Sequence, residues 1–146
     1  TTGDEEGEKT AVSDTIPTLK AVQEALEAFR GDIMQSPPAF SAMKIDGKRA
    51  YDLARQGKEV KLEARPVTIY SIELTNYDYP FVHFTANVSS GTYVRSLVED
   101  VGNLLKTGAY MSDLRRTRIG NFYLDDAVEV YTLTRESLQG DLRQFK

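Results

Sequence analysis

The clearest hydrophobic pattern in the chain is an alternation that gives way to a helical period. Over residues 81–89 apolar side chains occupy every second position, which predicts a half-buried β-strand. Apolar residues then recur at helical spacing, which predicts an amphipathic helix over residues 92–106. The polar turn between these elements brings Tyr93 and Arg95 to the start of the helix. Active sites are commonly built in this way, so we expect one here.

Two further patterns predict the rest of the core. Thr18 can cap a helix whose apolar residues share one face, and Gly31 is expected to end it. Residues 67–74 predict a strand whose alternation slips, so we expect a β-bulge near Tyr70 and Ser71. This order of elements predicts an α+β fold with a mixed, mainly antiparallel sheet and flanking helices.

The remaining stretches predict short elements after the break at Pro37 and Pro38. They are a strand over residues 41–45, a turn at 46–47, a helix over 49–56, a turn over 76–80, an extended stretch over 109–118, and short helices or extended segments over 125–146. The extended stretch offers Leu114 and Ile119 for burial. No repeat or flexible linker divides the chain, so we place no domain boundary within residues 1–146.

Composition adds limits to this picture. The chain has 146 residues, of which 40% are hydrophobic and 27% charged, which suits one domain with a modest core. It has no cysteine, which excludes a disulfide framework and thiolate chemistry. No apolar run is as long as a membrane span, and the acidic start does not resemble a signal peptide. We therefore expect a cytoplasmic protein without a membrane partner.

The charges are unevenly distributed although the net charge is only -4. Residues 44–65 hold seven basic residues against four acidic ones, and residues 106–118 hold four against one. Two basic islands in an acidic background suit a protein that binds RNA with one face. Ordinary solvated charges on helix surfaces are the alternative explanation.

Three stretches, in order, carry a family resemblance. They are the run from Gln35 to Gly57, the sequence GTYVRSL at residues 91–97, and LRR at residues 114–116. Together they make the chain similar to the TruB family of tRNA pseudouridine synthases. The resemblance implies a pseudouridine synthase fold and the isomerisation of uridine 55 in the T-loop of tRNA. It also implies tRNA, through its T-arm, as the partner, no metal or organic cofactor, and an intact enzyme that is a monomer.

One family feature is missing from these residues. The family's nucleophilic aspartate lies in a Gly-Thr-Leu-Asp-Pro loop, and no such run occurs in the sequence. The opening Thr1-Thr2-Gly3-Asp4 is similar to a family segment that follows that loop. We therefore expect residues 1–146 to be the C-terminal part of a catalytic domain, with no isomerase activity when tested alone.

The resemblance also assigns roles at the predicted active site. The reaction breaks a carbon–nitrogen glycosidic bond and rejoins the base through carbon 5, so the base must leave its stack. It needs a carboxylate, a cation beside that carboxylate, and a surface for the flipped base. The resemblance makes Arg95 the partner of the aspartate, Tyr93 part of the pocket wall, and Leu114 a contact of the base. On local pattern alone, Arg95 would pair with Glu99 on a solvated helix face, and Tyr93 and Leu114 would be packing residues.

A second set of residues is expected to contact RNA. These residues are Phe40, Lys44, Lys48, Arg49, Arg55, Arg115 and Arg116. The alternative is that Phe40 and Tyr51 pack against a short hairpin and helix. Asp46 and Asp113 are the carboxylates that could replace the missing nucleophile, but Asp46 lies in a turn signal and neither is assigned to catalysis. His83 has no partner residues at ligand spacing, so no metal site is predicted.

Three interpretations of function stay open at this point. The first is a fragment of a tRNA pseudouridine-55 synthase. The second is a fragment of another member of the superfamily, such as the RNA-guided, dyskerin-like enzymes. The third is a non-catalytic module that binds RNA or contacts another protein. An upstream aspartate loop would separate the first two interpretations from the third.

Overall fold

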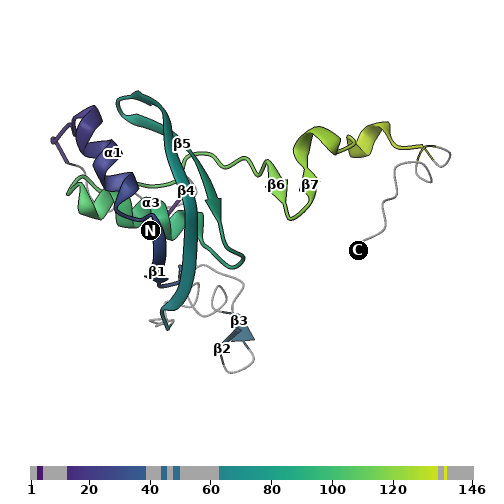
Figure 1. Cartoon of the computed structure of the whole chain (residues 1–146), viewed down its shortest axis with the longest axis horizontal. Coiled ribbons are helices and arrows are strands. Elements are labelled where there is room, and N and C mark those ends of the chain that lie inside the picture. Colours follow the sequence, from purple (N-terminus) through teal and green to yellow (C-terminus); the bar gives the residue numbers. More distant parts are fainter. Residues whose placement is uncertain are drawn as a thin grey trace. The chain divides into compact units, whose positions relative to one another are not determined.

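The computed structural model describes residues 3–4, 13–38, 44–45, 48–49, 63–134 and 137 (Figure 1). The chain divides into two compact units, Thr1–Asp113 and Leu114–Lys146. Among the described residues, the elements of the first unit are α1 (Leu19–Glu27), β1 (Gly31–Gln35), β2 (Lys44–Ile45), β3 (Lys48–Arg49), β4 (Arg65–Asp78), β5 (Phe81–Val88) and α3 (Val94–Leu104). The elements of the second unit are β6 (Arg118–Ile119), β7 (Phe122–Tyr123) and the short 3-10 helices η1 (Leu124–Asp126) and η2 (Val130–Thr132).

The main sheet has three antiparallel strands in the order β1-β4-β5. Strand β5 coincides with the predicted strand except for its last residue. Strand β4 is longer than predicted, and its register with β5 shifts between Ile69 and Ser71, which confirms the predicted bulge. A second irregularity lies between Leu74 and Asn76. Because β4 continues to Asp78, the turn before β5 is shorter than predicted and consists of Tyr79 and Pro80.

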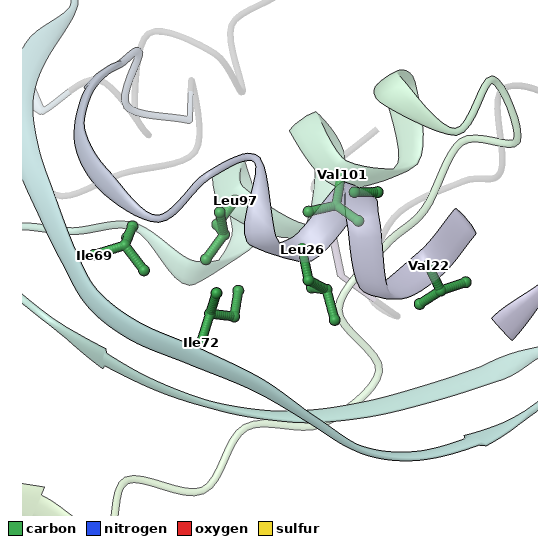
Figure 2. Close-up of a cluster of buried hydrophobic side chains, with 7 residues drawn as sticks. Val22, Leu26, Ile69, Ile72, Leu97 and Val101 are labelled. Atoms are coloured by element: carbon green, nitrogen blue, oxygen red, sulfur yellow. The ribbon is translucent and has the colours of Figure 1, made fainter. Parts of the chain in front are cut away.

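The hydrophobic core lies between this sheet and the two helices. Figure 2 shows side chains from β4, α1 and α3 that meet there, and the buried cluster comprises Val22, Ala25, Leu26, Ile69, Ile72, Leu97 and Val101. Each fully buried valine, leucine or isoleucine side chain contributes about 1.5 to 3 kcal/mol relative to exposure. The α+β fold with an antiparallel sheet and flanking helices is therefore confirmed.

The first helix begins as predicted but ends earlier. The Thr18 hydroxyl accepts a hydrogen bond from the Ala21 N–H at 3.2 Å, so Thr18 is the N-cap. The helix ends at Glu27, and Gly31 has a φ of +101° as the first residue of β1. The prediction that Gly31 ends the helix was therefore wrong. Strand β1 was not predicted because it is only five residues long and gains its structure from pairing with β4.

Helix α3 ends at a close approach of two backbone segments. The N–H groups of Thr107 and Gly108 both donate to the carbonyl of Gly102 at 3.1 Å. A Cβ atom at Gly102 would lie 2.3 Å from the backbone nitrogen of Ala109. Glycine is therefore required for the chain to turn back so closely over the end of α3. The helix proper covers Val94–Leu104, slightly less than the predicted range.

The predicted short elements have mixed outcomes. Strand β2 confirms a strand at residues 44–45 of the predicted range 41–45, and it pairs with β3 in an antiparallel ladder. Arg49 lies in β3, so the prediction that a helix begins there was wrong. The predicted turn at 46–47 and the rest of the predicted helix, residues 50–56, lie outside the described residues. The stretch 109–118 contains an isolated bridge at Met111 and the first residue of β6. Leu114 and Ile119 are exposed, so the prediction that they would be buried was wrong.

The second unit is described by itself. Strands β6 and β7 form a small hairpin, in which the Arg118 guanidinium lies over the Tyr123 ring at 5.8 Å. The two 3-10 helices follow and confirm the prediction of short helices near the C-terminal end. Over the part of the chain that the structure describes, no helix combines the length and hydropathy needed to cross a membrane.

Candidate active site

The loop between β5 and α3 is fixed to strand β4 at its beginning. The Ser89 N–H donates to the Thr68 carbonyl at 2.8 Å, and the Ser89 hydroxyl accepts from the Thr68 N–H at 2.9 Å. The Thr92 hydroxyl donates to the Ser89 carbonyl at 2.9 Å. Gly91 has a φ of +86°, which lets the chain turn between them. These bonds hold the loop as it approaches Tyr93.

The other end of the loop is fixed by the last residue of β1 and the residue after it. The side chain of Gln35 accepts a hydrogen bond from the Tyr93 N–H at 2.8 Å and donates to the Tyr93 carbonyl at 3.1 Å. Within the first turn of α3, the Ser96 hydroxyl donates to the Ser36 carbonyl at 2.9 Å. The start of α3 is therefore held by backbone and side chains that are remote in sequence.

The Arg95 guanidinium forms an ion pair with Asp4, its Nη1 lying 2.9 Å from Asp4 Oδ2. The two side chains are only 24% and 21% exposed, so this pair is partly shielded from water. The contact shows that Arg95 is not a solvated helix-surface residue. Asp4 is a site residue that the sequence interpretation did not assign. The residues around Asp4 gave no sign of this ion pair, because the two partners are 91 positions apart in the sequence.

The position of Asp4 is fixed by its neighbours. The Gly3 carbonyl accepts a hydrogen bond from the Met111 N–H at 2.9 Å, and Asp4 and Met111 form an isolated parallel bridge. Gly3 is buried with a φ of +78°, and a Cβ atom there would lie 2.4 Å from Glu99 Oε1. Glycine therefore lets the backbone at residues 3–4 pass close to α3, which brings the Asp4 carboxylate to Arg95.

The site is rich in carboxylates beside its arginine. Burial, and then the neighbouring Asp100 carboxylate, raise the pKa of Glu99 above its usual value, while Arg95 lowers it in part. Burial also raises the pKa of Asp100. Burial is thus the main factor that disfavours the ionised form of both carboxylates, and the Arg95 cation favours the ionised form of Glu99.

Glu99→Gln is expected to raise the melting temperature at neutral pH. A pKa that is raised on folding means that ionised Glu99 costs more free energy in the folded chain than in the unfolded chain. Glutamine removes that cost. The difference in melting temperature between Glu99→Gln and wild type should therefore shrink as the pH falls through the raised pKa of Glu99 towards 4.5, because Glu99 then becomes protonated. Thermal melts across this pH range measure it. Glu73→Gln, at an exposed position of β4, is the control, and an equal effect in both variants would contradict the prediction.

The predicted site residues fall into three groups. The structure places Tyr93 and Arg95 together at the start of α3. Leu114, which is 50% exposed, and the exposed Arg115 and Arg116 begin the second unit. Three of the predicted RNA contacts, Lys44, Lys48 and Arg49, belong to the β2–β3 hairpin, and Phe40 and Arg55 lie outside the described residues.

Comparisons with known proteins bear on this site. The family model described as the N-terminal domain of TruB family pseudouridylate synthase matches residues 1–94, more than half of the chain. The chain belongs to the TruB family. A second model, described as the tRNA pseudouridylate synthase B C-terminal domain, matches residues 95–144. The TruB resemblance in the sequence motifs is therefore confirmed.

Individual TruB relatives agree with this. The chain is 43% identical over 137 residues to the tRNA pseudouridine synthase B of Clostridium novyi (strain NT), covering 94% of this chain and 47% of that protein. It is 46% identical over 140 residues to the enzyme of that name from Pseudomonas aeruginosa (strain UCBPP-PA14), covering 96% and 46%. The chain spans about half the length of the curated relatives it matches.

A solved structure supports the fold. A chain in the crystal structure of a Cbf5-Nop10-Gar1 complex superimposes with a TM-score of 0.64 at 30% identity, covering 80% of this chain and 31% of that one. The TruB chain described here therefore shares its architecture with a solved protein over most of its length.

Proposed function

We propose that this chain supplies the C-terminal part of the catalytic domain of a tRNA pseudouridine synthase, which converts uridine 55 in the T-loop to pseudouridine. Residues 1–146 act as one functional part in this proposal. The observation that carries it is the ion pair of Arg95 with Asp4, which orients a shielded guanidinium within the GTYVRSL motif. The names of the relatives support the choice of reaction and of tRNA.

The proposed chemistry assigns Arg95 to the nucleophilic aspartate of the family loop. A guanidinium has several N–H donors in a planar fork, so one arginine can bind two carboxylates at once. Asp4 would fix the guanidinium from one side, and Arg95 would in turn hold the nucleophile ionised and oriented. Tyr93, two residues earlier, would form the pocket wall beside the base, and Leu114 would contact the base.

The proposed substrate is bound through the T-arm by the two basic islands. Phosphate contacts would come from Lys44, Lys48, Arg49, Arg55, Arg115 and Arg116, with Phe40 stacking on an unpaired base. In this proposal the enzyme acts as a monomer in the cytoplasm, without a metal or organic cofactor.

RNA binding should be weak but sensitive to salt. With ~3 to 5 phosphate contacts, the slope of log K against log salt for a T-arm hairpin should be about -2 to -4. Arg116→Gln should make this slope shallower by about 1, because one phosphate contact is lost. Fluorescence anisotropy over a salt series measures both. Arg30→Gln, at an exposed position beyond α1 and outside both islands, is the control. A flat salt response would leave the islands as ordinary solvated surface.

The proposed reaction is tested with a chain that carries the family's aspartate loop ahead of Thr1. Incubation with a T-arm RNA, followed by chemical mapping of pseudouridine, should show modification at a single uridine. The 146-residue chain by itself, which contains no Gly-Thr-Leu-Asp-Pro run, supplies the background. If the aspartate-bearing chain binds the RNA but modifies no uridine, the proposed reaction is wrong, and the non-catalytic RNA-binding interpretation replaces it.

A further inference from the structure

We propose that Gln35 is a positioning residue, whose buried side chain sets the place of Arg95 by holding the backbone of Tyr93. The inference rests on the proposed function, because Arg95 matters here as the partner of the nucleophile. Gln35 lies at the end of β1, 58 positions from Tyr93 in sequence, and is 2% exposed. The side chain does not contact the reacting atoms in this proposal and acts through the loop.

The hydrogen-bond geometry matches an amide side chain. The carboxamide accepts from the Tyr93 N–H at 2.8 Å and donates to the Tyr93 carbonyl at 3.1 Å, so both backbone groups of one residue are bound by one side chain. Only a side chain with adjacent donor and acceptor atoms can do this. Burying an amide costs free energy unless it is hydrogen-bonded, so the two bonds account for a polar group in this position.

The start of α3 explains why the two hydrogen bonds from Gln35 to Tyr93, here called the Gln35 clamp, are needed. A helix usually begins at a residue whose own side chain caps its first N–H groups. Here the N-cap is Tyr93, which forms no side-chain capping hydrogen bond. Gln35 instead holds the N-cap backbone from another strand, which leaves Tyr93 available for the pocket wall. Arg95 follows two residues later, so a displacement of the Tyr93 backbone would move its guanidinium.

A second contact on the same segment strengthens the inference. The Ser96 hydroxyl donates to the Ser36 carbonyl at 2.9 Å, so residues 35 and 36 contact positions on both sides of Arg95. A residue needed only to fill the core would require no donor and acceptor directed at this backbone. The clamp fixes the site in advance of substrate binding, which is how positioning contributes to rate.

The test uses Gln35→Met and Gln35→Glu in an active chain that carries the aspartate loop. Methionine keeps the length of the side chain but loses both hydrogen bonds. Single-turnover rates with saturating enzyme should fall by about tenfold to a hundredfold in Gln35→Met, because the guanidinium is misplaced. The Kd for T-arm RNA should stay within about twofold, since no phosphate contact is lost. Gln23→Met, at an exposed position of α1, is the matched control and should retain the wild-type rate.

Gln35→Glu separates positioning from a merely structural role. A protonated carboxyl group has a donor and an acceptor like the carboxamide, whereas the ionised form has only acceptors and repels the Tyr93 carbonyl. The rate of this variant relative to wild type should therefore rise as the pH falls, and Gln35→Met should show no such recovery. Hydrogen exchange at the Tyr93 amide, expressed as protection relative to the intrinsic rate at the same pH, should weaken in Gln35→Met and recover in Gln35→Glu as the pH falls.

The outcomes distinguish this inference from the proposed function. A wild-type single-turnover rate in Gln35→Met, with only a lower melting temperature, would overturn the positioning role and leave the function intact. An aspartate-bearing wild-type chain without activity would overturn the proposed function and this inference with it. A rate loss in Gln35→Met together with the pH-dependent recovery in Gln35→Glu supports both.

Discussion

Arg95→Lys, in a chain that carries the aspartate loop, is expected to lower the rate of pseudouridine formation by about a hundredfold or more. Lysine keeps the positive charge but cannot present the planar fork of donors that binds a carboxylate through both oxygens. The nucleophile would be misplaced, and its pKa would rise as the cation moves away. Single-turnover rates and RNA affinity measured together test this, and the affinity should change by less than about threefold.

Two companion variants decide what the loss means. If Asp4 acts by orienting Arg95, then Asp4→Asn should lower the rate, and Asp4→Asn with Arg95→Lys should lose little more than Arg95→Lys alone. Glu99→Gln removes the carboxylate one turn further along the helix. If Arg95 only paired with Glu99 on an exposed helix face, Arg95→Lys and Glu99→Gln would have equal effects. Each would change the free energy of unfolding by a few tenths of a kcal/mol. Near-wild-type turnover in Arg95→Lys would therefore mean that this arginine does not hold the nucleophile, and that its ion pair with Asp4 only stabilises the fold.

The elements that the sequence predicted correctly are those whose pattern is local. Strand β5 shows a two-residue alternation, α3 shows a helical period, and the Thr18 cap is a short-range contact. The bulge in β4 was predictable for the same reason, because a slip in alternation is visible within a few residues. These features needed no knowledge of the rest of the fold.

The features that were missed depend on partners far away in sequence. Strand β1 gains its structure from β4, and its five residues include only two large apolar side chains, Ile33 and Met34. Gly31 was interpreted as a helix terminator because glycine after an apolar period usually has that role. Its positive φ instead serves the entry into β1. Leu114 was expected to be buried from its apolar character alone, and the structure leaves it exposed.

The candidate site divides in the same way. Tyr93 and Arg95 were found because the motif that carries them is contiguous. Asp4 was quoted as part of the family resemblance but received no role, because its pairing with Arg95 crosses 91 positions. Gln35 likewise reaches Tyr93 across 58 positions. The sequence motif was therefore enough to identify Tyr93 and Arg95 as candidate site residues. The fold was needed to show that Asp4 and Gln35 hold them in place.

Leu97→Ala is expected to destabilise the first unit by about 2 to 5 kcal/mol. Leu97 is fully buried at 0% exposure and lies on the core-facing side of α3, the helix that carries Arg95, so the substitution leaves a cavity between α3 and the sheet (Figure 2). For a domain of this size the melting temperature should fall by roughly 10 to 20 °C. Calorimetry or circular dichroism measures it. Leu104→Ala, on the same helix but 53% exposed, is the control and should shift the melting temperature by only a few degrees. Equal shifts in the two variants would mean that α3 is not held by this core, and the fixed position of Arg95 would then need another explanation.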